Sequence, residues 1–155
     1  MESKQAPKHL NSRKLEDLCP DLQKVVMYME VEWDKNFPEA PNPILTQTYR
    51  SPELQEAYYS QWREDLESVN KRRAVCGLAP ITFKENVIIT KAQPGKSKHQ
   101  IYPSQAFDIA FVGGRGELDW DEKLFTNYAK IAGAKFPKLK WGGMFKFKDN
   151  PHFEI

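Results

Sequence analysis

The segment Ala106-Phe107-Asp108-Ile109-Ala110-Phe111-Val112 decides the fold. Its side chains alternate, so a β-strand would place Phe107, Ile109 and Phe111 on one face. Asp108, flanked by two alanines, would lie on the opposite face. The large apolar face predicts a strand that other elements cover on that side. The acid leaves two alternatives open, a functional carboxylate and a solvated Asp on an edge strand.

Three other segments carry apolar residues at helical spacing. We predict helices over residues 20–34, 52–69 and 120–133. From residue 12, apolar residues recur at helical spacing, and Pro20 interrupts them, so it suits the first turn of a second helix there. Ser51 suits the N-cap of the helix over residues 52–69. Asp119 and Glu122 predict a capping box at the start of the helix over residues 120–133.

Short runs of β-forming residues occur on both sides of the deciding segment. We predict further strands over residues 44–49, 86–91, 139–141, 144–147 and 152–155. Helices come first along the chain, and strands and helices mix afterwards, which favours an α+β fold with an antiparallel sheet. Residues 1–11 are polar and predict a flexible tail, whereas residues 12–155 have the length of a single domain.

The composition is that of a globular protein, with 40% hydrophobic and 28% charged residues. No apolar run approaches the ~18 residues of a membrane span. The net charge of +2, with scattered Lys and Arg, does not predict nucleic-acid binding. The two cysteines, Cys19 and Cys76, form no CxxC motif, so we expect reduced thiols.

The histidines are candidate metal ligands. The chain has only three, of which His9 lies in the predicted tail, His99 precedes the deciding segment and His152 opens the last predicted strand. Two His and one carboxylate can hold a catalytic zinc with one open position for water. Spacing alone is a weak signal here, because the chain contains no HExxH motif.

Four short motifs strengthen the signal by their order along the chain. They are Ser97-Lys98-His99, Ala106-Phe107-Asp108, Trp141-Gly142-Gly143 and Asp149-Asn150-Pro151-His152-Phe153-Glu154. Together with Thr48-Tyr49-Arg50 and Leu54-Gln55, they resemble the D-alanyl-D-alanine carboxypeptidase and L-alanyl-D-glutamate endopeptidase family, which includes many phage endolysins. The resemblance spans residues 12–154. It implies a hedgehog/D-Ala-D-Ala peptidase-like fold, with a small antiparallel sheet and helices packed on one side.

The resemblance also implies roles for individual residues. The implied zinc (Zn2+) ligands are His99, Asp108 and His152. Asp149 would be the general base, Arg50 would steady the oxyanion, and Ser97 and Gln55 would hold supporting positions. One departure is the separation of nine positions between His99 and Asp108, where the family usually has seven and often a glycine. This puts the substrate contacts in doubt more than the metal.

The resemblance implies a peptidase of peptidoglycan stem peptides, and we expect an L-alanyl-D-glutamate endopeptidase of the endolysin type. A D-alanyl-D-alanine carboxypeptidase or dipeptidase is the first alternative, since Arg63, Arg115 or a lysine could bind a terminal carboxylate. The second alternative is a zinc-bearing binding module without catalysis, although such a module would not need Asp149. A phage tail component with wall-degrading activity is a further alternative.

Residues 1–8 lack the apolar stretch of a secretory signal. We therefore expect synthesis in the cytoplasm, followed by holin-type release and action in the periplasm or cell wall. We also expect a monomer with no nucleic-acid partner.

Overall fold

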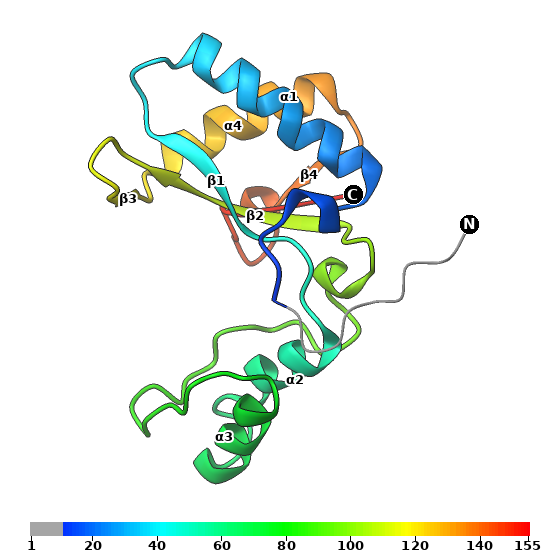
Figure 1. Ribbon diagram of the computed structural model, residues 1–155, viewed down its shortest axis with the longest axis vertical. Helices are drawn as coiled ribbons and strands as arrows, with labels where there is room; N and C mark the ends of the chain where they lie inside the picture. The colour runs from blue at the N-terminus through cyan, green and yellow to red at the C-terminus, as the bar shows by residue number, and fades with distance from the viewer. Residues whose placement is uncertain (1–10) are drawn as a thin grey trace.

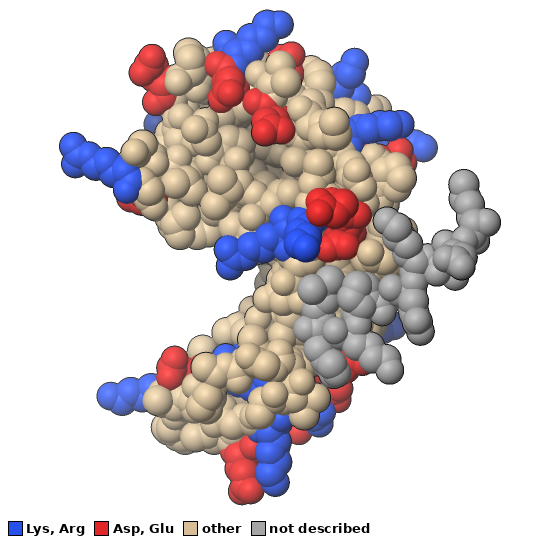
Figure 2. Space-filling view, viewed as in Figure 1, with Lys and Arg blue, Asp and Glu red and all other residues tan. Residues whose placement is uncertain are grey.

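The computed structural model describes residues 11–155 and has two lobes (Figure 1). The sheet lobe comprises residues 11–50 and 98–155, and the small lobe comprises residues 51–97. A narrow waist separates them in Figure 2. The predicted tail, including His9, lies outside the described residues except for Asn11, which forms a β-bridge with Arg50.

A five-stranded antiparallel sheet forms the centre of the sheet lobe. Its strands are β1 (Asn42–Gln47), β2 (Ala106–Val112), β3 (Leu118–Asp119), β4 (Lys140–Trp141) and β5 (His152–Glu154). The main path runs β1-β2-β5-β4, and β3 pairs with β2. β2 therefore has the predicted bounds and is an inner strand, so the alternative of an edge strand is wrong.

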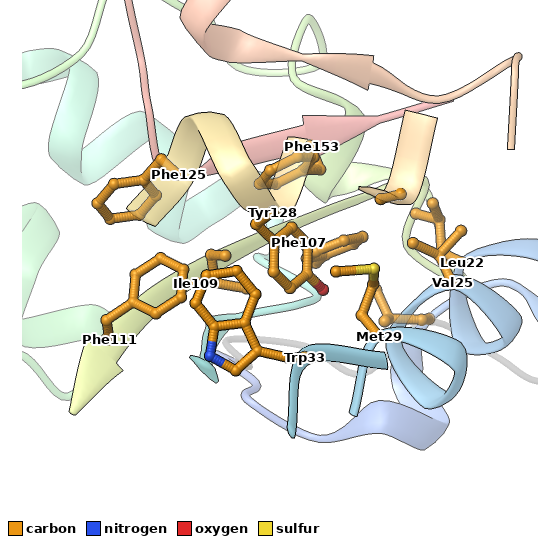
Figure 3. Close-up of a cluster of buried hydrophobic side chains, with 12 residues drawn as sticks. Leu22, Val25, Met29, Trp33, Phe107, Ile109, Phe111, Phe125, Tyr128 and Phe153 are labelled. Carbon is orange, nitrogen blue, oxygen red and sulfur yellow. The ribbon is translucent and has the colours of Figure 1, made fainter. Parts of the chain in front are cut away.

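Two helices, α1 (Pro20–Asn36) and α4 (Glu122–Lys135), cover one face of the sheet (Figure 1). Phe107, Ile109 and Phe111 point toward them and join a buried cluster with Trp33 and Phe153 (Figure 3). Each such side chain contributes about 1.5–3 kcal/mol when fully buried. The predicted α+β fold, with helices on one side of a small antiparallel sheet, is confirmed for this lobe.

The small lobe contains α2 (Pro52–Ser60) and α3 (Leu66–Val75). Ser51 caps α2 as predicted, because its hydroxyl accepts a hydrogen bond from the Leu54 N–H at 3.2 Å. The prediction of one continuous helix is wrong. Trp62 has a φ of 70°, its side chain is 64% exposed, and its N–H donates to Asn86 Oδ1 at 2.6 Å. Asp65 then caps α3.

Three other local predictions are wrong. Residues 86–91 and 144–147 form no strand, and Gly142–Met144 is instead a short 3-10 helix, η3. The cap of α4 is Asp121, which accepts a hydrogen bond from the Lys123 N–H, rather than an Asp119–Glu122 box. The remaining elements are the 3-10 helices η1 (Leu15–Asp17) and η2 (Lys98–Gln100).

Both cysteines, Cys19 and Cys76, are free thiols, as predicted. Among the described residues, no helix is both long and apolar enough to cross a bilayer.

Candidate metal and active site

The sheet brings three predicted metal ligands together on the face opposite α1 and α4. Asp108 of β2 and His152 of β5 are direct partners across the sheet. The alternation that buries Phe107 and Phe153 against the helices turns Asp108 and His152 to the other side. His99 reaches the same point from η2.

The ligand atoms of these residues converge on one point. His99 Nε2 lies 3.2 Å from Asp108 Oδ1 and 3.2 Å from His152 Nδ1, and the His152 Nδ1–Asp108 Oδ1 distance is 3.0 Å. All three atoms lie within 4.8 Å of one another. Both histidines are buried, and Asp108 is half-buried. The side chains thus form a three-ligand set of the kind that holds a catalytic zinc.

Hydrogen bonds on the far side of each ring orient the two histidines. His99 Nδ1 lies 2.7 Å from the Thr48 carbonyl oxygen, so the Nδ1–H donates there and Nε2 keeps its lone pair. His152 Nε2 lies 2.9 Å from Glu154 Oε1, so the Nε2–H donates to the carboxylate and Nδ1 faces the centre. These tautomers fit a metal ion bound by Nε2 of His99 and Nδ1 of His152.

Burial and hydrogen bonds in the cluster strongly shift the pKa values of Asp108 and His152. Burial opposes ionisation of Asp108, but hydrogen bonds with His152 and His99 hold its pKa well below the usual value. Burial would lower the pKa of His152, but hydrogen bonds with Asp108 and Glu154 raise it to about 9. In the metal-free protein at neutral pH, His152 is therefore protonated and paired with carboxylates on both sides.

The Trp141-Gly142-Gly143 motif fixes the loop that carries Asp149. A Cβ on Gly142 would collide with the Asp149 carbonyl group, and one on Gly143 would collide with the Trp141 indole. The indole N–H donates to the Asn150 carbonyl oxygen at 2.7 Å, and the Asp149 N–H donates to the Gly142 carbonyl oxygen at 2.9 Å. Gly142 thus permits a close backbone approach three residues before His152, and Gly143 leaves room for the Trp141 indole.

Asp149 lines the same cleft as the three ligand residues. Partial burial and the neighbouring Asp108 carboxylate raise the pKa of Asp149 above its usual value, although His152, His99 and Arg50 act in the opposite direction. A carboxylate with a raised pKa beside a candidate metal centre is suited to proton transfer.

Arg50 also lines this cleft, and two glutamines fix its guanidinium group. Gln47 Oε1 accepts from Arg50 Nη2 at 2.9 Å and from Nε at 3.1 Å, while Gln55 Oε1 accepts from Nη1 at 2.8 Å. The Arg50 N–H donates to the His99 carbonyl oxygen at 2.9 Å, which ties the two residues together. Gln55 thus holds the Arg50 guanidinium group, and its supporting role in the site stays a prediction.

Gln47, Thr48 and Glu154 belong to the site, but no role was predicted for them. Gln47 lies at the irregular end of β1, where the register with β2 shifts between Leu45 and Gln47. The only sequence signal for Glu154 is that it shares a strand face with His152. Thr48 contributes its backbone carbonyl group, which every residue type has, so the sequence carries no signal for this contact.

Ser97 caps η2 and accepts a 3.3 Å hydrogen bond from the His99 N–H, so it holds the turn that carries His99. The cleft has a volume of about 710 Å³. Ile88 and Ile89 of the small lobe lie on one wall, and Phe145 and Phe147 lie on another. Arg63 and Arg115, considered above as carboxylate-binding cations, do not line it.

Comparison with solved structures identifies the fold. The L-Ala D-Glu endopeptidase ChiX of Serratia marcescens superposes with a TM-score of 0.52 at 17% identity, over 94% of this chain and 88% of that chain. A mutant of the vancomycin resistance D,D-pentapeptidase VanY, in complex with Zn(II), has a TM-score of 0.48 at 15% identity, over 85% of this chain and 70% of that chain. No family model and no curated protein sequence matches the chain. The chain therefore has the fold of the L-Ala D-Glu endopeptidase ChiX, and the fold that the sequence resemblance predicted is confirmed.

Proposed function

We propose that residues 12–155 form a zinc-dependent peptidase domain that cuts the L-alanyl-D-glutamate bond of peptidoglycan stem peptides. The observation that carries the proposal is the convergence of His99 Nε2, Asp108 Oδ1 and His152 Nδ1 in one cleft with Asp149 and Arg50. Two imidazoles and one carboxylate are a zinc-binding set with room for a fourth ligand.

The roles of the other residues follow from their chemistry. Zinc, when bound, would lower the pKa of a coordinated water toward about 7 and polarise the scissile carbonyl group. Asp149 accepts the proton of the attacking water and passes it to the leaving amine nitrogen. Arg50 faces the negative charge that develops on the carbonyl oxygen, and Gln47 and Gln55 hold its guanidinium group in place.

The choice of bond rests on the shared fold of ChiX, an L-Ala D-Glu endopeptidase. A D-alanyl-D-alanine carboxypeptidase or dipeptidase is the second candidate function. It is favoured by the lysines of the cleft, Lys91, Lys96, Lys98 and Lys148, because an exopeptidase needs a cation for the terminal carboxylate. A non-catalytic zinc module is disfavoured by Asp149, which such a module would not need.

The test is digestion of purified peptidoglycan, with the released ends identified by mass spectrometry. We expect new D-glutamate amino ends, which both a chelator and Asp149→Ala abolish. Release of D-alanine or of its dipeptide would contradict the proposed bond. Stoichiometric zinc binding without any release would support the binding module.

The expected monomeric state, the absence of a nucleic-acid partner and holin-type release into the cell wall stay predictions. On the face shown in Figure 2, acidic and basic side chains are interspersed over both lobes. This distribution is unlike the basic stripe that a nucleic-acid-binding surface requires.

A further inference from the structure

One wall of the cleft is an irregular segment that polar side chains hold in place. This clamped segment comprises residues 85–92 of the small lobe and contains no strand. Gln55 Nε2 donates to the Ala92 carbonyl oxygen at 2.7 Å, and Arg63 Nη2 donates to the Thr90 carbonyl oxygen at 3.0 Å. Gln61 Nε2 donates to the Val87 carbonyl oxygen at 3.3 Å. Because Gln55 also binds Arg50, the clamped segment is fixed relative to the candidate catalytic residues.

The clamped segment exposes apolar side chains in the cleft. Ile88 and Ile89 are 48% and 53% exposed, and Phe147 on another wall is 61% exposed. None of these three side chains belongs to the buried core cluster. Apolar surface gathered in a concave site is a contact surface for a ligand.

Lys91 lies between these apolar surfaces. Its Nζ is 3.5 Å from the centre of the Phe147 ring, so its side chain connects the clamped segment with the wall formed by residues 145–149. A cation on an exposed aromatic ring gains only a weak interaction in water. A stronger partner can therefore displace Lys91 from Phe147 at low cost.

Among the other cations of the cleft, three interact with polar groups, whereas Lys96, like Lys91, has no salt bridge to any residue in the range 11–155 but lies outside the clamped segment. Arg50 is bound by two glutamines, and Lys148 Nζ lies 3.6 Å from Glu122 Oε1. The hydrogen bond with His152 is the main cause of the lowered pKa of Glu154, and the charge of Lys98 acts in the same direction. Lys91 has no salt bridge to any residue in the range 11–155, so its charge is available to a ligand.

We propose that Lys91 binds a free carboxylate of the substrate beside the scissile bond, so that the cleft selects acidic stem peptides over amidated ones. This inference rests on the proposed function. When D-glutamate is linked onward through its γ-carboxyl group, its α-carboxylate is attached to the carbon next to the scissile nitrogen. Amidation of that carboxylate removes the charge and preserves the shape. Ile88, Ile89 and Phe147 exclude water around the ion pair and thereby strengthen it.

The test compares two synthetic stem peptides that differ only in a free or amidated D-glutamate α-carboxyl group. We expect kcat/KM to be at least about tenfold higher for the acid, as for the loss of one charge-assisted hydrogen bond. In Lys91→Met this ratio should fall toward one, mainly through a higher KM for the acid. Lys91→Arg should keep most of the preference for the acid over the amide. Lys84→Met is the matched control, because Lys84 is an exposed lysine outside the cleft, and it should retain the wild-type ratio.

Salt provides a second readout that a merely structural role of Lys91 would not change. For the wild type, the KM of the acid should rise more steeply with ionic strength than the KM of the amide, and Lys91→Met should remove the difference. An equal loss on both peptides in Lys91→Met, or an unchanged ratio, would overturn the carboxylate subsite while leaving the proposed function intact. Failure of the wild type to cut either peptide would overturn both proposals.

Discussion

The two lobes of the molecule are held together by different interactions. In the sheet lobe, apolar side chains from α1, α4 and the sheet form a single buried cluster, which includes Trp33, Phe107 and Phe125 (Figure 3). In the small lobe, few apolar residues are buried, and hydrogen bonds from side chains to the backbone hold the irregular parts of the chain. The two lobes also contribute different parts of the candidate site.

The sheet lobe supplies all three candidate metal ligands from a close-packed scaffold, which suits a centre that tolerates little movement. The small lobe supplies a wall of the cleft, where side chains can change without disturbing a core. Arg50 and Gln55 connect the two lobes. The following predictions test this division, from the largest expected effect to the smallest.

Loss of a metal ligand in the sheet lobe should have the largest effect. Asp108→Asn removes the negative charge while keeping the shape of the side chain, so we expect loss of stoichiometric zinc and a fall in activity on the order of 10³-fold or more. Metal analysis of the dialysed protein measures the first effect, and peptide hydrolysis measures the second. The control is Asp119→Asn on β3, which should bind zinc normally. Full zinc occupancy in Asp108→Asn would break the assignment of the metal to the sheet lobe.

Stability should depend on the sheet lobe more than on the small lobe. Phe125→Ala empties part of the main core and should cost about 3–5 kcal/mol of unfolding free energy. Val69 is the buried apolar residue of α3, and Val69→Ala should cost only about 1–2 kcal/mol, because it removes two methyl groups. Urea unfolding followed by circular dichroism measures both. Equal losses would contradict the larger cost expected from the larger cavity in the main core.

Arg50 connects the two lobes, and its replacement should lower the rate of catalysis without changing zinc binding. Arg50→Met should lower kcat by about 10²–10³-fold, the usual cost of removing one oxyanion-stabilising donor, with zinc content unchanged. Gln47→Leu and Gln55→Leu should each give a smaller loss, since each removes one of two groups that hold the guanidinium. If these variants lose zinc in parallel with activity, Arg50 supports the fold of the metal centre instead.

The hydrogen bond from His152 to Glu154 should tune metal affinity. Glu154→Gln keeps an acceptor for the His152 Nε2–H but removes the charge, and we expect zinc affinity to fall about 10–100-fold. Competition with a chromophoric chelator measures this change. Lys140 faces Glu154 on β4, so Lys140→Gln is a nearby control that leaves the His152 pair intact. Unchanged affinity in Glu154→Gln would mean that Glu154 does not orient the ligand.

The pH dependence of zinc binding should follow from His152. Its pKa is raised to about 9 in the metal-free protein, so zinc must displace a proton from His152 at any lower pH. The apparent affinity should therefore rise about tenfold per pH unit between pH 6.5 and 9, once the pH dependence of the reference chelator is corrected for. Calorimetry in buffers of different ionisation enthalpy should show at least about one proton released per zinc at pH 7, because a zinc-bound water with a pKa near 7 would add to the proton of His152. Release of no proton would show that His152 is already neutral.

Local signals predicted the long elements β2 and α1 of the sheet lobe well and the irregular segment of the small lobe poorly, for a physical reason. The alternation in residues 106–112 and the proline at the first position of α1 depend on neighbours in sequence, and the structure has the corresponding elements. Residues 86–91 have the composition of a strand, but Gln61, Arg63 and Gln55 satisfy their backbone groups. Those partners are distant in sequence, so local propensity misidentified the segment.

The candidate site shows the same limit. His99, Asp108 and His152 were identified because they lie in short ordered motifs, and the structure brings them together. The hydrogen-bond acceptors that orient them, the Thr48 carbonyl and the Glu154 carboxylate, depend on how the strands and η2 approach one another. Gln47 was missed because its position results from an irregularity in β1 that its residue type does not signal.

The central claim is that zinc binds through specific atoms of three residues in the sheet lobe. A crystal structure of the zinc-loaded protein, with anomalous data collected on both sides of the zinc absorption edge, tests it most directly. We predict one peak at about 2.0–2.2 Å from His99 Nε2, His152 Nδ1 and an Asp108 carboxylate oxygen. A peak elsewhere, or no zinc peak in the cleft of a protein loaded with one equivalent, would contradict the account.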